Sequence, residues 1–270
     1  MQIHQKEGLV DMIIDVQNVS WTRGVLTLLN NVSWRVNEGE HWALLGLNGS
    51  GKTTLLNMIT GYQWPTKGSI SVLGEQYGNV DLRELRKSIG WVSSSLQEKL
   101  HRTDRTQYVI ISGKHATIGL YDELDDQDLE RAKELMETLG CAHLWDREYQ
   151  TCSQGEKQKL LIARALMANP RVLILDEPCN GLDLFSRERL LDSIRDLSER
   201  KDTPTLIYVT HHTEEILPVF SHTLLLRRGE VVNSGLTSDL MTTEVLSSFF
   251  EAPVDVERHG ERVYVRAALG

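Results

Sequence analysis

Three stretches of the chain are almost continuously apolar and end in polar residues. They cover residues 42–45, 172–175 and 206–210. Runs this short and this apolar are typical of strands buried on both faces, whereas strands with one face in water alternate between apolar and polar residues. The pattern therefore predicts an α/β molecule built on a central, largely parallel sheet.

Shorter runs with strand composition lie on either side of these three, separated by glycine, asparagine and charged residues. The chain is predicted to turn at residues 21–24 and to break between two short strands at Asn30 and Asn31. The additional predicted strands cover residues 12–19, 25–36, 69–72, 89–92, 223–227 and 231–234, with a hairpin over 254–267.

The segment from Ser93 to about Arg147 is polar, charged and without β-branched runs, which predicts a helical insertion. Its clearest helix covers residues 126–139, because apolar residues recur there at helical spacing between a capping aspartate and Gly140. The other predicted helices cover residues 54–59, 82–87, 154–168, 184–199 and 237–250.

These elements predict the domain organisation. We expect a flexible tail over residues 1–11, one α/β domain over residues 12–236, and a C-terminal helix and hairpin over residues 237–270. The domain is expected to have a mixed sheet core, antiparallel strands near its N-terminus, and a helical subdomain inserted over about residues 93–168.

The composition is ordinary for a soluble globular protein, with 40% hydrophobic and 25% charged residues. A net charge of −9 argues against nucleic acid or an anionic lipid surface as a general partner. The chain has no apolar run of the roughly 18 residues that a membrane span needs, and no signal peptide core. Its three cysteines, an odd number without a C-x-x-C pair, indicate a reducing, cytoplasmic location.

Between the first buried strand and a predicted helix lies the sequence GLNGSGKTT. Its glycines permit positive φ and keep Cβ atoms away from a ligand, so that backbone amides can turn inward. With the positive end of the helix, these amides form an anion site shaped for a polyphosphate, and the strand–loop–helix setting is the one this pattern requires. The alternative is a glycine-rich turn with a solvated lysine. The residues predicted to bind a nucleoside triphosphate are Gly46, Leu47, Asn48, Gly49, Ser50, Gly51, Lys52, Thr53 and Thr54.

Within this loop we expect Lys52 to reach the β- and γ-phosphates and the Thr53 hydroxyl to hold Mg²⁺. Asp176 ends a buried strand, where removing a carboxylate from water costs free energy. Orienting Mg²⁺ is a role that would account for a carboxylate at this place. Glu177 follows and is predicted to polarise the attacking water as general base. The alternative is that both carboxylates only cap the following turn.

His211 ends another buried strand and is predicted to hydrogen-bond the γ-phosphate, with its neighbour His212 as the rival. Trp21 is predicted to return beside the nucleotide and stack on adenine, although a tryptophan at a strand end also packs well on a core. Residues 151–159, TCSQGEKQK, begin a predicted helix and offer a second seat for phosphate. Taken alone, the serine and the glutamate three residues later read better as an ordinary capping box.

The order of these segments resembles that of the ATP-binding cassette (ABC) ATPases over about residues 12–235. The matching segments are the aromatic Trp21, the Walker A loop GLNGSGKT, a helical insertion, the signature CSQGEKQK, the Walker B strand VLILDEP, the D-loop NGLD that ends at Asp183, and the pair Thr210-His211. The resemblance implies that Mg-ATP is bound and hydrolysed between two cassettes packed head to tail, as a homodimer or with a second cassette. It also implies that Ser153, Gly155 and Glu156 contact the γ-phosphate of the other copy, and that Asp183 crosses the interface.

The chain departs from the family pattern at three places. In the signature, Cys152, Gln154 and Glu156 replace the usual Leu, Gly and Gln, while the serine and second glycine are kept. The glutamine that should follow the strand at 89–92 is replaced by Ser94. The nearest glutamine is Gln97, to which we assign the Mg²⁺ and nucleotide contact, with Ser94 as the alternative. Cys179 stands where Thr or Ser is commoner, a mild change.

Two functions follow from a single cassette without a membrane span. The favoured one is the cytoplasmic, energy-coupling ATPase subunit of a transporter, held at the inner face of the cell membrane by a separate permease. The permease would dock in the cleft between the helical insertion and the core, near residues 97–105. The alternative is a soluble ATPase that dimerises on ATP and acts as a regulatory switch.

Overall fold

The computed structural model describes residues 12–93, 100, 103–115 and 125–268, and its centre is a six-stranded sheet. Its strand order is β10-β9-β3-β8-β7-β6. All neighbouring strands are parallel except β9 and β10, so the predicted mixed sheet is confirmed. The strands are β3 (Trp42–Leu45), β6 (Ile89–Val92), β7 (Val172–Asp176), β8 (Thr205–Thr210), β9 (His222–Arg227) and β10 (Glu230–Leu236).

Both faces of the central sheet are buried, which explains the continuous apolar runs in the sequence. Successive side chains of a strand point to opposite faces. In β7, Leu173 and Leu175 enter the core shared with the helical insertion, while Val172 and Ile174 enter the core shared with the N-terminal strands. The sheet is therefore the middle layer of the molecule.

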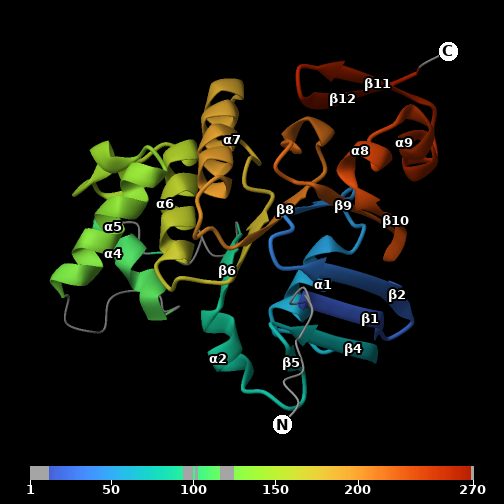
Figure 1. The fold of residues 1–270 in the computed structure, drawn as a ribbon, viewed down its shortest axis with the longest axis horizontal. Coiled ribbons are helices and arrows are strands. Elements are labelled where there is room, and N and C mark those ends of the chain that lie inside the picture. The colour runs from blue at the N-terminus through green and yellow to red at the C-terminus, as the bar shows by residue number, and fades with distance from the viewer. Residues whose placement is uncertain (1–11, 94–99, 101–102, 116–124, 269–270) are drawn as a thin grey trace, which may run out of the picture.

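A second, antiparallel sheet covers one side of this layer, in the order β2-β1-β4-β5 (Figure 1). Its strands are β1 (Met12–Arg23), β2 (Leu26–Asn37), β4 (Lys67–Val72) and β5 (Glu75–Gln76), and it packs near helix α1 (Lys52–Ile59). The predicted turn at 21–24 is displaced, because β1 continues to Arg23 and the chain turns at Gly24 and Val25, and the predicted break at Asn30 and Asn31 was wrong. Asn31 takes a φ of 52°, and shifts in the β1–β2 register absorb the irregularity as bulges, so both strands continue.

The helical insertion is confirmed and stands to one side of the sheet, with α6 between its other helices and α7 (Figure 1). Close packing here requires a glycine at position 113, because a Cβ there would lie 1.9 Å from the carbonyl oxygen of Arg164.

Between α1 and the C-terminal segment, the helices of the described residues are α2 (Leu82–Lys87), α4 (Thr106–Ile111), α5 (Asp126–Thr138), α6 (Gln154–Leu166) and α7 (Leu184–Ser198). The insertion also contains the 3₁₀ turns η1 (Ser112–His115), η2 (Ala142–Leu144) and η3 (Tyr149–Thr151).

The C-terminal segment folds back over the main core as α8 (Thr237–Leu240), α9 (Thr243–Phe250) and the hairpin β11 (Val254–His259) and β12 (Arg262–Ala267). The single helix predicted over 237–250 was wrong. The Thr242 hydroxyl accepts a hydrogen bond from the backbone of Val245 at 3.3 Å and starts a separate helix. Among the helices of the described residues, none combines the length and the apolar character that crossing a bilayer demands.

Candidate nucleotide-binding site

The loop predicted to bind phosphate joins β3 to α1, and its glycines are required by its geometry. Gly49 and Gly51 take φ values of 77° and 104°, which residues with a Cβ rarely adopt. At Gly46 a Cβ would lie 2.4 Å from the Ser50 Oγ and 2.6 Å from the carbonyl oxygen of Leu226. The loop is therefore tightly wound, as the motif requires.

Segments distant in the sequence hold this loop from behind. The Gly46 amide donates to the carbonyl oxygen of Thr210 at 3.2 Å, at the end of β8. The Gly229 amide, in the turn between β9 and β10, donates to the carbonyl oxygen of Ser50 at 2.8 Å. The Gly229 carbonyl oxygen in turn accepts from the Asn30 amide of β2 at 2.8 Å. The three contacts fix the position of the loop against both sheets.

Lys52 is buried in the mouth of the loop, with 6% of its surface exposed. Its Nζ donates to the carbonyl oxygens of Gly46 at 2.7 Å and Leu47 at 3.3 Å. It also lies 3.3 Å from Glu177 Oε1. A buried ammonium needs partners of this kind, and here they place it at the centre of the predicted phosphate site.

Glu177 and His211 meet beside this lysine, from the ends of β7 and β8. His211 Nδ1 lies 3.3 Å from Glu177 Oε1, although the two atoms are not aligned for a hydrogen bond. Glu177 has a φ of 49°, a strained conformation for a residue with a side chain, and its amide donates to the carbonyl oxygen of Val209 at 2.9 Å. Strain of this kind is concentrated at functional sites. His212 Nδ1 instead lies 3.6 Å from Glu214 Oε1.

Asp176 ends β7 next to Glu177 and is largely buried. Burial raises the pKa of the Asp176 carboxyl to about 6, the nearby charge of Glu177 adds to this effect, and Lys52 opposes it. Burial destabilises the ionised form of this carboxyl group, because it removes the water that would solvate the charge. A bound cation would stabilise the ionised form in place of that water.

The raised pKa of Asp176 predicts a dependence of stability on pH. The folded chain holds this proton up to about pH 6, whereas the ordinary pKa of an aspartate is 3.8. Stability is therefore highest below the lower value and falls as pH rises between them, by up to about 3 kcal/mol. Asp176→Asn is expected to raise the free energy of unfolding at pH 7.5 in EDTA, but not at pH 4, as measured by urea denaturation. The matched control Asp192→Asn, on exposed α7, is expected to change neither value; a gain for Asp176→Asn that is equal at both pH values would contradict the assignment.

A cavity of about 600 Å³ opens over the phosphate loop. It is lined by loop residues, by both carboxylates at the end of β7, and by residues that the sequence analysis did not select. Gln158 is one of these: it is 5% exposed, and within the described part of the chain its Oε1 has no hydrogen-bond partner. Only the tertiary structure could reveal it, because nothing in its local sequence distinguishes it. The unselected lining residues are Leu28, Gln154, Gln158, Asn180 and Gly181.

Two predicted nucleotide contacts, Trp21 and Gln97, are not among the described residues that line the cavity. Trp21 is in β1 opposite Leu29 and packs partly against the N-terminal core, and it does not line the cavity. Its predicted stacking on adenine stays a prediction. Gln97, the predicted Mg²⁺ and nucleotide contact, lies outside the described residues.

Ser153 caps the N-terminus of α6 in a capping box with Glu156. The Ser153 Oγ accepts from the Glu156 amide at 3.3 Å, and Glu156 Oε2 accepts from the Ser153 amide at 2.7 Å. Burial raises the pKa of Glu156, but hydrogen bonds from Ser153 outweigh it and the pKa is lowered. Gly155 allows α6 to approach α7, because a Cβ there would lie 3.2 Å from the Ser186 Cβ. The structural role expected for this segment is therefore present, and its contact with a second nucleotide stays a prediction.

Asp183 caps α7 and accepts from the Ser186 amide at 3.0 Å and from the Ser186 hydroxyl at 2.6 Å. These hydrogen bonds hold the pKa of Asp183 below its usual range. Asp183 is thus an ionised residue at an exposed helix start. Its predicted passage across a dimer interface stays a prediction.

A glycine cradle with a buried lysine, and two carboxylates at the end of a strand of the same sheet, define a P-loop NTPase. A model of the ABC transporter family matches residues 29–180. The chain is 47% identical over 258 residues to the uncharacterized ABC transporter ATP-binding protein YlmA of Bacillus subtilis, covering 95% of this chain and 98% of that protein. It is 42% identical to the uncharacterized ABC transporter ATP-binding protein YmeB of Lactococcus lactis, covering 94% of this chain and 98% of that protein. The chain therefore belongs to the ABC transporter family, as the resemblance predicted, and is the ATPase subunit of a transporter.

Solved structures of ABC transporters have the same fold. One is a chain of an ABC transporter in an inward-facing conformation, with a TM-score of 0.77 and 25% identity, covering 96% of this chain and 98% of that chain. Another is the dimeric structure of MJ0796, a bacterial ABC transporter cassette, with a TM-score of 0.71 and 26% identity, covering 83% of this chain and 98% of that chain. The predicted P-loop fold with a helical insertion is confirmed.

Proposed function

We propose that this chain binds Mg-ATP between two copies packed head to tail and hydrolyses it to drive a separate permease. The observation that carries the proposal is that Lys52 and Glu177 line one cavity above the phosphate loop, with His211 Nδ1 3.3 Å from Glu177 Oε1. A cation from the start of α1, a carboxylate that follows β7 and an imidazole that follows β8 meet there, which is the set needed to hold a triphosphate and direct water at it.

Each side chain has a distinct task in this mechanism. Lys52 and the loop amides stabilise the charge that develops on the γ-phosphate. Glu177 accepts a hydrogen bond from the attacking water and orients it in line with the bond that breaks. His211 lies beside the same oxygen of Glu177 and donates to the γ-phosphate when ATP is bound.

The residues at the cavity fit Mg²⁺. Thr53 presents its hydroxyl at the start of α1, and Asp176 is a buried carboxylate whose raised pKa reflects missing favourable contacts. Oxygen ligands of this kind suit Mg²⁺, which would neutralise phosphate charge when bound. Thr53 and Asp176 would hold it, with Gln97 as the further predicted ligand.

The second copy would complete the site with the start of its α6. Ser153 and Gly155 stand at a helix N-terminus, whose positive end favours a phosphate. The dimeric cassette MJ0796, at 26% identity, supports two copies as the working unit. The proposal is tested by crystallising a hydrolysis-dead variant with ATP. Ser153 within hydrogen-bond reach of the γ-phosphate on the partner copy supports it, and Ser153 remote from every bound phosphate contradicts it.

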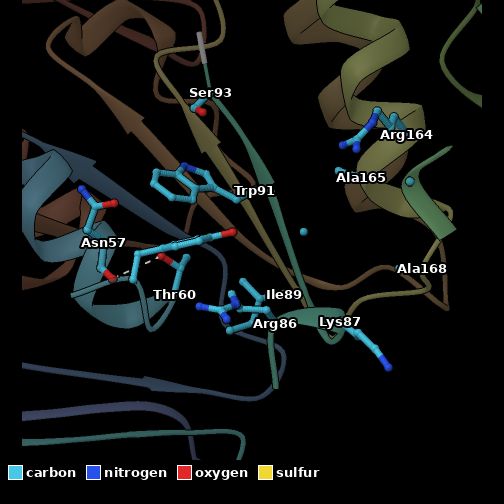
Figure 2. A pocket seen from close by; sticks show the side chains of 13 residues that line it. Asn57, Thr60, Arg86, Lys87, Ile89, Trp91, Ser93, Arg164, Ala165 and Ala168 are labelled. Atoms are coloured by element: carbon cyan, nitrogen blue, oxygen red, sulfur yellow. Dashed lines mark hydrogen bonds between the residues drawn. The ribbon is translucent and has the colours of Figure 1, made fainter. Parts of the chain in front are cut away.

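A docking place for the permease lies between the sheet and the helical insertion. Figure 2 shows Trp91 and Arg86 on one wall of a cavity of about 310 Å³, and Arg164 and Ala165 of α6 on the other. The exposed ring of Tyr62 lies 4.7 Å beneath the Arg86 guanidinium. Aromatic and arginine side chains are the usual anchors of protein interfaces. The wall of the cavity that contains Trp91 is close to the proposed Mg²⁺ ligand Asp176, because Trp91 pairs with Ile174 of β7, the strand that ends at Asp176.

Association with a permease would place the chain at the cytoplasmic face of the membrane. The test is to express the chain with and without the membrane proteins encoded beside it and to separate membranes from the soluble fraction. Recovery in the membrane fraction only with those proteins supports a transporter subunit. A purely soluble ATP-dependent dimer in both cases supports the alternative, a regulatory switch.

A further inference from the structure

A cluster of charged side chains joins the C-terminal hairpin to the catalytic domain. Arg262, the first residue of β12, donates from Nη1 to Glu188 Oε1 at 3.2 Å, and its Nη2 lies 2.8 Å from Glu188 Oε2. The same Nη1 also donates to the backbone carbonyl oxygen of Glu214 at 3.3 Å. One guanidinium therefore binds two segments, helix α7 and the turn η4 (Thr213–Glu215).

Arg187 adds a second bridge between the same segments. Its Nη1 lies 3.5 Å from Glu214 Oε1, and its Nε lies 3.4 Å from Glu188 Oε1. We call Arg187, Glu188, Glu214 and Arg262 the clasp. Both arginines are largely buried, with exposed fractions of 22% and 16%, so salt screens these pairs less than pairs on the open surface.

One arm of the clasp leads to His211. Turn η4 begins two residues after it, and hydrogen bonds make the intervening chain stiff. The Thr210 hydroxyl donates to Glu215 Oε2 at 2.6 Å and accepts from the His212 amide at 3.0 Å. Because Glu215 is buried, at 4% exposure, this arrangement cannot shift freely. A displacement of the Glu214 carbonyl would therefore carry His211 with it.

The other arm leads to Asp183 and the loop before it. Glu188 is in the second turn of α7, the helix that Asp183 caps. Asn180 and Gly181, just before the cap, line the cavity above the phosphate loop. A helix is a stiff element, so the position of Glu188 sets the position of this loop.

We propose that Arg262 is a positioning residue for ATP hydrolysis, through which the C-terminal hairpin fixes His211 relative to the Asp183 loop. The inference rests on the proposed function, which gives His211 and Asp183 their tasks. Arginine suits the position because its planar group can bind a carboxylate with two nitrogens and still donate to a carbonyl oxygen. Through Arg262, the C-terminal extension affects the rate of ATP hydrolysis without contacting the nucleotide.

Variants of Arg262 are expected to fold, because the hairpin is held by apolar contacts as well. Val254 and Val263 are 6% and 7% exposed and belong to the main core cluster. The two strands pair over their whole lengths, from Val254 opposite Ala267 to His259 opposite Arg262. Loss of the clasp would therefore leave the hairpin docked while freeing η4 and α7 to shift.

The test compares Arg262→Ala with Arg266→Ala in the full chain. Arg266 is on the same strand, is 67% exposed and pairs with Glu257 inside the hairpin, so it controls for loss of charge. We expect Arg262→Ala to lower kcat for ATP about tenfold, because small misplacements of catalytic groups are costly, with KM for ATP within about twofold. Arg266→Ala is expected to keep both constants. Arg262→Lys is expected to recover only part of the rate, because one ammonium cannot span both acceptors.

A double-mutant cycle with Glu188→Gln separates positioning from general weakening. We expect the double variant to be no slower than Arg262→Ala alone, because both changes open the same clasp. The inference would be overturned if kcat for Arg262→Ala stayed within twofold of wild type, or if Arg266→Ala lost as much kcat as Arg262→Ala. It would also be overturned if the losses of kcat from Arg262→Ala and Glu188→Gln multiplied in the double variant. Thermal denaturation shows whether Arg262→Ala is folded at the assay temperature. If it is not, the kcat of Arg262→Lys tests the inference by the same criteria. A wild-type chain that fails to hydrolyse ATP would instead overturn the proposed function on which the inference rests.

Discussion

Glu177→Gln is expected to reduce ATP turnover by about 10²–10⁴-fold while leaving ATP binding intact. The amide keeps the size of the side chain but cannot accept a proton from water. The residue is held in a strained backbone conformation, φ 49°, with Oε1 3.3 Å from both Lys52 Nζ and His211 Nδ1, so its place relative to the γ-phosphate is set before ATP arrives. The measurement is phosphate release at saturating Mg-ATP.

The same variant is expected to accumulate as an ATP-bound dimer, since hydrolysis is the step that opens it. Size-exclusion chromatography with and without Mg-ATP measures this. Glu199→Gln, on the exposed end of α7, is the matched control and should turn over at the wild-type rate. Turnover by Glu177→Gln within about fivefold of wild type would remove Glu177 from its role as general base.

Lys52→Ala is expected to weaken ATP binding itself, by about 10- to 100-fold. The lysine makes hydrogen bonds to the carbonyl oxygens of Gly46 and Leu47 and is 6% exposed, so its charge acts in a region largely without water. A charge-assisted hydrogen bond to phosphate contributes about 1.5–3 kcal/mol, and each 1.4 kcal/mol corresponds to a tenfold change in affinity. Titration with a fluorescent ATP analogue measures the dissociation constant.

Lys67→Ala, at an exposed position of β4, controls for the loss of one positive charge. It should bind the analogue like wild type. Unchanged affinity in Lys52→Ala would contradict the assignment of the phosphate loop. The two variants are complementary, because Glu177→Gln is expected to keep the ligand and lose the reaction, and Lys52→Ala is expected to lose the ligand.

The parts of the site that the sequence predicted are those encoded by short, contiguous segments. The phosphate loop is one such segment, and its glycines 46, 49 and 51 are required by backbone geometry that a motif records. Asp176 and Glu177 were predictable because a buried strand that ends in two carboxylates is costly without a ligand. The capping box of Ser153 and Glu156 is local in the same sense.

The parts that the sequence did not predict depend on contacts between distant segments. The amide of Gly229 supports Ser50 only because β9 lies beside β3 in the sheet. Gln158 faces the cavity only because of how α6 packs. The Asn30-Asn31 pair predicts a strand break where the structure has a bulge, because the same residue type serves both purposes and only pairing with β1 decides between them.

The support of the phosphate loop by late parts of the chain has a consequence for biosynthesis. Strand β3 takes its hydrogen-bond neighbours from β8 and β9, and Ser50 takes its neighbour from Gly229. A nascent chain still on the ribosome and shorter than 229 residues contains the whole motif but lacks the groups that shape it. We expect such a chain to have no competent cradle, since pairing over long separations comes late in folding. Capture of nucleotide would then begin only when translation of the cassette is nearly complete.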